Sequence, residues 1–327
     1  MNDISGKNEW VEALRAFLIL YIAIHHLTSR YMDFYPEVQF SLVSENGGRV
    51  GNFMFMMISG YFLAPTLLKG NGVFDCAKYC ANRWWRLFPA VVLCTTITYL
   101  VVSIFPLVEE RMVTFKEYLC NFLIIHPNIP YVENTHWFVA ALLQMQLLLG
   151  GLLFIESEKL RVRVIVWLFV FSLVLCLIYD LPKTKIDNIL YWITYSAWLP
   201  ILLSGSILYY IKSTKLPRYM IIAPLIVLCV YVFKYHLFVV IVTFCLFVFA
   251  ICGKMSVKCP ALLTKMGGVS FIWYLLHQNI GFCMINILRN LGIINEVILL
   301  SVALIGTLLL AFSVNYFIRL VPRKLFK

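Results

Sequence analysis

The chain has 327 residues, of which 62% are hydrophobic and only 13% are charged. A water-soluble domain carries roughly 25% charged residues, so this composition excludes a soluble globular protein and favours one embedded in a lipid bilayer. The net charge of +11 does not indicate a nucleic-acid partner, because the basic residues fall in short clusters between apolar runs, as membrane topology requires.

The apolar runs predict about ten transmembrane helices, since a helix needs about 20 apolar residues to cross a bilayer. Residues 1–10 are polar and partly acidic, and no small-residue cleavage site follows the first apolar run. We therefore expect this run to be retained as a membrane helix rather than removed as a signal peptide. In chain order the predicted spans are residues 10–29, 50–68, 87–106, 136–155, 164–180, 189–210, 219–234, 236–252, 269–288 and 296–318.

The distribution of Lys and Arg predicts the orientation of these spans. With the N-terminus in the cytoplasm, every predicted inside loop is basic and most of the 27 Lys and Arg residues fall inside. We therefore expect an all-α, polytopic membrane bundle of about ten helices, with both termini cytoplasmic and a single domain over residues 1–327. The longest stretch outside the bilayer, residues 107–135, is expected on the outer side, with a short re-entrant or interfacial helix.

Ionisable residues inside a bilayer are costly, so those of the first span are functional candidates. Arg15 lies near its inner end and His26 near its outer end, and helix geometry places them about 20° apart around the axis and about 16 Å apart along it. They share one face, Glu12 is placed to pair with Arg15, and His25 lies on a neighbouring face. The arginine could hold an anionic donor, while the imidazole accepts a proton or is itself acylated. The alternative is that Arg15 reaches the inner headgroups and the histidines lie at the outer interface.

Two features mark the second predicted span and the inner loop that follows it. Ser59 and Gly60 interrupt an apolar run and allow a neighbouring helix or a ligand to approach closely. Lys78, Arg83 and Arg86 form a compact basic cluster, and Arg presents a planar fork that matches phosphate. The cluster predicts an anion site, although ordinary membrane anchoring also produces basic inner loops.

Polar residues also occur in the fourth and ninth spans. His136 begins the fourth span, and the ninth carries the triplet His277, Gln278 and Asn279 near its middle, shortly after Tyr274. Polar groups at that depth must face protein or water, so we expect a polar cavity within the bundle. Apart from Glu12, no carboxylate falls well inside a predicted span. The cysteines and histidines show no zinc-type spacing, so no metal is expected.

Five segments in order resemble the signature of the membrane-bound acyltransferase-3 family. They are the stretch from Glu12 to His26, with ten residues between Arg15 and His26, followed by FMFMMISGYFLAP, NRWWRLFPA, HWFVAALLQMQ and FIWYLLHQNI. Each segment alone is weak, but the five together cover the whole chain. The resemblance implies one bundle of about ten helices with a buried acyl-transfer site.

The resemblance also implies a reaction and a location. Members of the family are acyl-CoA-dependent O-acyltransferases, typically O-acetyltransferases, that use cytoplasmic acetyl-CoA as the donor. Their acceptors are hydroxyl groups of lipopolysaccharide, capsule or other surface polysaccharide, or of a lipid-linked sugar. The implied location is the bacterial cytoplasmic, or inner, membrane, with membrane lipid around the bundle and no nucleic-acid partner.

Family roles can be carried over where the residues match. The matching histidine, His26, would be the catalytic group and the matching arginine, Arg15, would be essential, while Arg83, Arg86 and Lys78 would contact CoA. We expect a second set to support the site, namely Glu12, His136, Tyr274 and His277. The chain departs from some members at the fourth-span motif, where it has Ala and Gln instead of Glu, so no acidic partner is carried over.

Two other functions would account for part of these features. A transporter or flippase for a lipid-linked envelope sugar would also have ten spans and many aromatic residues, but it does not explain the shared face of Arg15 and His26. A purely structural subunit of an envelope synthesis complex predicts that Arg15→Ala and His26→Ala leave the sugar chemistry unchanged.

Overall fold

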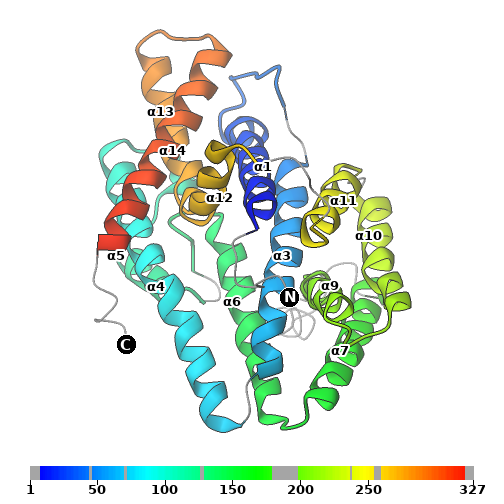
Figure 1. Ribbon diagram of the computed structural model, residues 1–327. Coiled ribbons are helices and arrows are strands. Elements are labelled where there is room, and N and C mark those ends of the chain that lie inside the picture. The colour runs from blue at the N-terminus through cyan, green and yellow to red at the C-terminus, as the bar shows by residue number, and fades with distance from the viewer. Residues whose placement is uncertain are drawn as a thin grey trace. The chain divides into compact units, whose positions relative to one another are not determined.

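The structure is a computed structural model that describes residues 8–43, 46–69, 72–125, 129–178, 198–235, 238–253 and 259–320 (Figure 1). Every regular element within these ranges is a helix, as the sequence predicts. The α-helices are α1 (Glu9–His25), α2 (Tyr31–Phe34), α3 (Gly47–Lys69), α4 (Val73–Ile104), α5 (Phe115–Cys120), α6 (His136–Gly150), α7 (Glu158–Ile178), α9 (Leu199–Lys212), α10 (Ile222–Tyr235), α11 (Val239–Ile251), α12 (Ala261–Tyr274), α13 (His277–Asn290) and α14 (Glu296–Leu320). Shorter helical turns are η1 (His26–Arg30), η2 (Glu109–Arg111), η3 (Asn121–Leu123), η4 (Gly151–Phe154) and η5 (Arg218–Ile221).

Six of the described helical segments are long and apolar enough to cross a membrane. They are Glu9–Phe34, Gly47–Lys69, Val73–Ile104, His136–Phe154, Glu158–Leu177 and Glu296–Leu320. This confirms the expected all-α fold for the described part of the chain, with six candidate membrane spans. Shorter apolar helices lie where the sixth, seventh and eighth spans were predicted, at Leu199–Lys212, Arg218–Phe233 and Val239–Ile251. Part of the sixth predicted span falls outside the described residues. The count of ten and the inside location of both termini therefore stay predictions.

The ninth predicted span is not one straight helix. Its residues form α12 and α13, which meet at 86° across a break of two residues, Leu275 and Leu276. Together the two helices make a seventh candidate span or a re-entrant loop. The bend has a local cause, because the His277 ring contacts the carbonyl oxygens of Trp273 and Tyr274 and so completes the end of α12 with a side chain.

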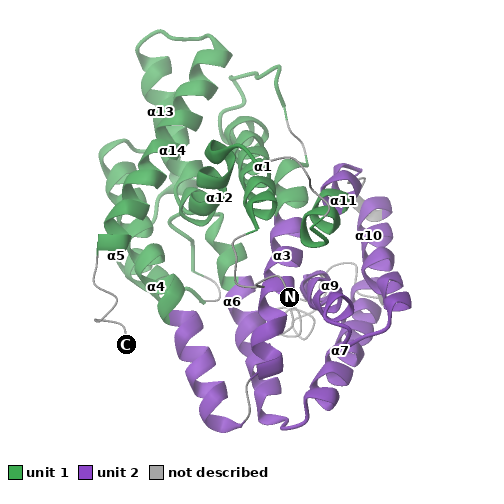
Figure 2. Ribbon diagram, in the orientation of Figure 1, with its two compact units in different colours: residues 1–51, 85–140, 245–327 green, residues 52–84, 141–244 purple. Residues whose placement is uncertain are grey.

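The chain divides into two compact units (Figure 2). The first comprises residues 1–51, 85–140 and 245–327, and the second comprises residues 52–84 and 141–244. The helices α3, α4, α6 and α11 contribute residues to both units.

In the first unit, α1 packs along α12 and α13 packs along α14 (Figure 1). Gly267 allows the first contact, because a Cβ there would overlap the backbone of Glu12. A buried apolar cluster around Leu27, Tyr31 and Phe282 then joins the end of α1 to α13 and α14. Small residues such as Gly267 let helices approach closely, and in membranes close van der Waals packing rather than the hydrophobic effect holds helices together. The unit thus fixes the C-terminal end of α1 against the bend between α12 and α13.

The first unit also contains the predicted short helix outside the spans. The described part of residues 107–135 folds into η2, α5 and η3, and a Thr114–Glu117 capping box begins α5. The Asn121 side chain bonds the backbone of Val132 at 3.0 Å and of Pro130 at 3.0 Å. This loop is therefore tied back on itself just before α6, which positions the residues that precede His136.

In the second unit, α3 packs closely on α9 through two glycines. A Cβ at Gly60 would overlap the backbone of Leu202, and one at Gly205 would overlap the backbone of Met57. The Ser206 hydroxyl donates to the Gly60 carbonyl oxygen at 2.9 Å. The Ser59–Gly60 pair of the sequence thus serves helix packing in this structure.

Candidate active site

His26 lies where the regular helix of the first span ends. The α1 helix runs to His25, and His26 begins the π-helical turn η1, a wider turn that is frequent at functional sites. The ring is partly exposed, but its Nδ1 atom is buried and has no hydrogen-bond partner among the described residues. A buried polar atom without a partner costs free energy, so His26 Nδ1 is a candidate contact for a reactant.

His277 is the first residue of α13, and its side chain is completely buried at the bend. Its Nδ1 atom lies 3.0 Å from the carbonyl oxygen of Tyr274 and 3.2 Å from that of Trp273. Carbonyl oxygens only accept hydrogen bonds, so Nδ1 carries the hydrogen and Nε2 carries the lone pair in the neutral ring. Within the described residues, the buried Nε2 has no hydrogen-bond partner.

The structure brings these two histidines together. Their ring centroids lie 5.2 Å apart with an interplanar angle of 55°, and the His25 ring contacts His26 edge-on at 5.1 Å. Residues far apart in the sequence therefore form an imidazole pair with two unsatisfied nitrogen atoms. Such a pair can take a proton from a hydroxyl and return it to a leaving group.

The start of α6 holds the backbone of the bend. The Tyr274 hydroxyl donates to the Thr135 carbonyl oxygen at 2.9 Å, and the Thr135 hydroxyl donates to the Tyr274 carbonyl oxygen at 3.1 Å. His136 Nε2 lies 3.4 Å from the Leu275 carbonyl oxygen. Tyr274 and His136, both predicted to support the site, are thus buried against the segment that carries His277.

Two charged residues that the sequence reading missed lie beside this bend. Glu133 is fully buried, and its Oε2 accepts the backbone N–H of Asn279 at 3.0 Å. Arg111, from η2, is also buried and donates through Nη1 to Asn279 Oδ1 at 3.3 Å. The Gln278 carboxamide finds two partners when its oxygen and nitrogen are exchanged. In that orientation the Gln278 oxygen accepts from Arg111 Nη2 at 2.7 Å, and the Gln278 nitrogen donates to Glu133 Oε1 at 3.3 Å.

Burial perturbs both of these charged groups, which lie outside the membrane-spanning helices. Desolvation raises the pKa of Glu133 to about 8, against the Asn279 N–H and the charge of Arg111, which both lower it. Desolvation likewise lowers the pKa of Arg111 to about 10, while the carboxylate of Glu133 raises it. The Arg111 guanidinium also lies 4.1 Å from the ring centroid of Phe34 and 5.2 Å from that of Phe282.

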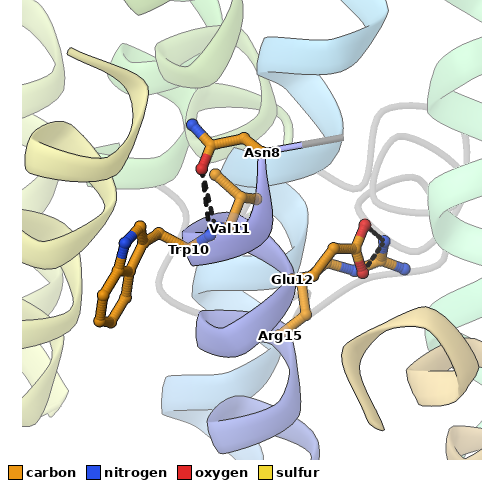
Figure 3. A network of polar contacts seen from close by, with 5 residues as sticks. All are labelled: Asn8, Trp10, Val11, Glu12 and Arg15. Carbon is orange, nitrogen blue, oxygen red and sulfur yellow. Dashed lines mark hydrogen bonds and ion pairs between the residues drawn. The ribbon is translucent and has the colours of Figure 1, made fainter. Parts of the chain in front are cut away.

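Arg15 lies apart from the histidine pair. Its guanidinium donates to Glu12 at 3.1 and 3.3 Å, which confirms the expected pairing, and Figure 3 shows the two side chains meeting on one side of α1. The Arg15 side chain is thus held by Glu12, one turn earlier on α1. The helical rise between Arg15 and His26 separates the two residues by about 16 Å along the axis. Asn8 begins the helix by accepting the backbone N–H groups of Trp10 at 3.1 Å and Val11 at 3.3 Å.

The basic cluster predicted to contact CoA lies on α4. Lys78 and Arg86 are exposed, and Arg83 is partly buried with its guanidinium 5.2 Å from the ring centroid of Tyr79. The Tyr79 hydroxyl donates to the Gln146 carbonyl oxygen at 3.0 Å, which fixes the ring below Arg83. Contact with CoA stays a prediction for all three basic residues.

Comparison with protein families bears on the reaction. The family model described as an acyltransferase domain matches residues 8–316, which is nearly the whole chain. Comparison with curated proteins and with solved structures finds no match. The matched range includes the histidine pair, the bend and the charged loop residues. The extent of this match shows that the chain belongs to the acyltransferase-3 family and is a multi-pass membrane acyltransferase.

Proposed function

We propose that the protein transfers an acetyl group from cytoplasmic acetyl-CoA to a hydroxyl of a surface polysaccharide or lipid-linked sugar in the bacterial inner membrane. The observation that carries the proposal is the contact of His26 with His277, each with a buried ring nitrogen that has no partner among the described residues. An acid–base pair sheltered inside a helical bundle suits a reaction that would otherwise lose its thioester to water.

His26 acts as the general base in this proposal. It removes the proton from the acceptor hydroxyl, and the oxygen attacks the thioester carbonyl carbon. The carbon–sulfur bond then breaks, and the CoA thiolate takes the proton from the His26 imidazolium. An ester, free CoA and neutral His26 remain, so the step is balanced without a further reactant.

His277 orients the base. Its hydrogen is committed to the Trp273 and Tyr274 carbonyl oxygens, so its Nε2 is available only as an acceptor. The His277 ring lies 5.2 Å from the His26 ring, and in this proposal the contact holds His26 in the orientation that transfer needs. A neutral His26 is the form that a general base requires.

Charged groups of α1 and α4 bind the donor. Arg83, Arg86 and Lys78 contact the phosphates of CoA, to which Arg offers a bidentate fork. Arg15, held by Glu12, provides a further positive charge on the face of α1 that leads to His26. In this proposal the thioester of cytoplasmic acetyl-CoA meets the acceptor hydroxyl at His26.

The experiment follows label from acetyl-CoA into envelope polysaccharide in membrane vesicles. The wild type should incorporate label, His26→Gln should lose it by at least about 100-fold, and His25→Gln, the matched neighbour, should retain most of it. Normal incorporation in His26→Gln at equal protein level would refute the mechanism. Two results together would instead identify a flippase. The wild type would leave the polysaccharide unlabelled, and a deletion strain would retain lipid-linked sugar on the inner leaflet.

Polysaccharide NMR of cells with and without the protein then identifies the product. An O-acetyl signal that disappears with the protein and with His26→Gln supports transfer to that hydroxyl. An unchanged spectrum in the deletion strain would refute a polysaccharide acceptor.

A further inference from the structure

The first turn of α13 has backbone N–H groups that no helical carbonyl can satisfy, and a buried carboxylate from another segment reaches them. Glu133 Oε2 accepts the Asn279 N–H, two residues after His277. Leu276, which precedes the helix, provides no side-chain cap. Glu133 therefore acts as the N-terminal cap of α13 from outside the helix.

The side chains of the same turn are held as firmly as its backbone. Glu133 Oε1 accepts from the Gln278 amide nitrogen, and Arg111 donates both to the Gln278 oxygen and to Asn279 Oδ1. The Asn279 amide nitrogen donates to the Val132 carbonyl oxygen at 2.6 Å. Each polar atom of this pair of side chains thus meets a group of opposite character, which requires Arg111 and Glu133 together.

Arg111 is itself restrained. Its guanidinium lies against the Phe34 and Phe282 rings, and its side chain is 4% exposed. Phe34 ends α2, which continues the chain from His26 through η1, and Phe282 lies on α13 after His277. Arg111 therefore contacts both segments that carry the histidine pair.

We propose that Glu133 and Arg111 are positioning residues that hold the first turn of α13 so that His277 stays against His26. This inference rests on the proposed function for its kinetic consequence, but the geometry that it asserts can be measured without activity. Neither residue touches the reacting atoms; both act through Gln278, Asn279 and the helix end that begins at His277. Residues that orient a catalytic group through hydrogen bonds typically contribute about 10- to 100-fold.

The test compares Glu133→Ala and Arg111→Met with the matched control Glu110→Ala, an exposed carboxylate in the same loop. In the labelled acetyl-CoA assay, the two positioning variants should lose about 10- to 100-fold in kcat with an unchanged KM for acetyl-CoA. Glu133→Gln keeps an oxygen that can accept the Asn279 N–H, so it should recover part of the activity. A change in KM alone, or equal activity in Glu133→Ala and the control, would overturn the proposal.

A double-mutant cycle separates positioning from a general structural role. Because Glu133 acts through His277, Glu133→Ala should cost little further activity in a His277→Ala background. Additive losses would overturn the proposal, since they would mean that Glu133 acts by another route. Protein level and the thermal unfolding midpoint are measured for each variant, so that unfolding is recognised.

A spectroscopic measurement keeps this test independent of the proposed function. Purified full-length protein carrying ¹⁵N-labelled histidine should show altered ring-nitrogen signals for His26 and His277 in Glu133→Ala, and unchanged signals in Glu110→Ala. Altered signals with no acyl transfer by the wild type would refute the proposed function and support the positioning role. Unchanged signals in Glu133→Ala would refute the positioning role even if the wild type transfers acetyl groups.

Discussion

Replacement of Gly267 by alanine should separate α1 from α12. A Cβ at this position would lie 2.5 Å from the carbonyl carbon of Glu12 and 2.9 Å from its Cα, and closer still to its carbonyl oxygen. Carbon atoms pack at about 3.5–4.0 Å, so the two helices must part by about 1 Å there. The atoms in the way belong to the backbone and cannot rotate aside.

The expected cost follows from two opposing effects. Overpacking of this kind destabilises by about 1–3 kcal/mol, whereas alanine in place of glycine inside a helix returns at most about 1 kcal/mol. We expect a net loss of about 1–2 kcal/mol. Because α1 leads to His26 and α12 leads to His277, activity should also fall about tenfold or more, since a displacement of about 1 Å at a reacting pair can cost 100-fold.

Gly268 provides the matched control, because a Cβ there would meet nothing within 4 Å. Gly268→Ala should be as stable as the wild type, or slightly more stable, with normal activity. The assays are the thermal unfolding midpoint of the purified protein and label transfer from acetyl-CoA in vesicles at equal protein level. If Gly267→Ala matched Gly268→Ala in both, close packing of α1 on α12 would not be what holds the histidines together.

Three further predictions concern other contacts. Gly60→Ala should lower the unfolding midpoint by several degrees, because its Cβ would lie 2.7 Å from the Leu202 carbonyl carbon, whereas Gly151→Ala, which meets nothing within 4 Å, should not. Tyr274→Phe should cost about 0.5–1.5 kcal/mol, since it removes the Tyr274 hydrogen bond at 2.9 Å while the Phe138 N–H still donates to the Thr135 carbonyl oxygen at 3.2 Å; an unchanged denaturation curve would contradict this. Burial raises the pKa of Glu133 from 4.5 to about 8, so its contribution to stability is complete below about pH 4.5 and is lost as pH rises through 8. The stability of the wild type relative to Glu133→Gln should fall across this window by up to about 1.4 kcal/mol per pH unit, and a constant difference would refute the assignment.

The sequence predicted those parts of the site that lie within apolar runs. The triplet from His277 to Asn279 stands out because polar residues in a span must face protein, and all three are buried. The helical period also predicted that Glu12 pairs with Arg15. These features depend only on the local order of residues along one helix.

The bend and the charged loop could not be predicted in this way. No proline or glycine marks the break at Leu275 and Leu276; its cause is a contact of the His277 side chain with the end of the preceding helix. Arg111 and Glu133 lie outside every apolar run, where charged residues are ordinarily solvated, so composition gave no indication that both are buried. Their burial depends on the loop folding back toward α13, which is a tertiary property.

The bend and the buried charges require one another. A helix that begins within a bundle exposes N–H groups, and neither lipid nor the preceding helix can accept them, so a break at His277 is stable only if an acceptor is supplied. Glu133 supplies it, and Arg111 donates to the Gln278 and Asn279 side chains of the same turn. The break in turn frees His277 from a regular helical position and places its ring against His26. Removing either residue therefore leaves polar groups at the helix start without a partner, which is why we expect the loop to matter for acyl transfer although it touches neither substrate.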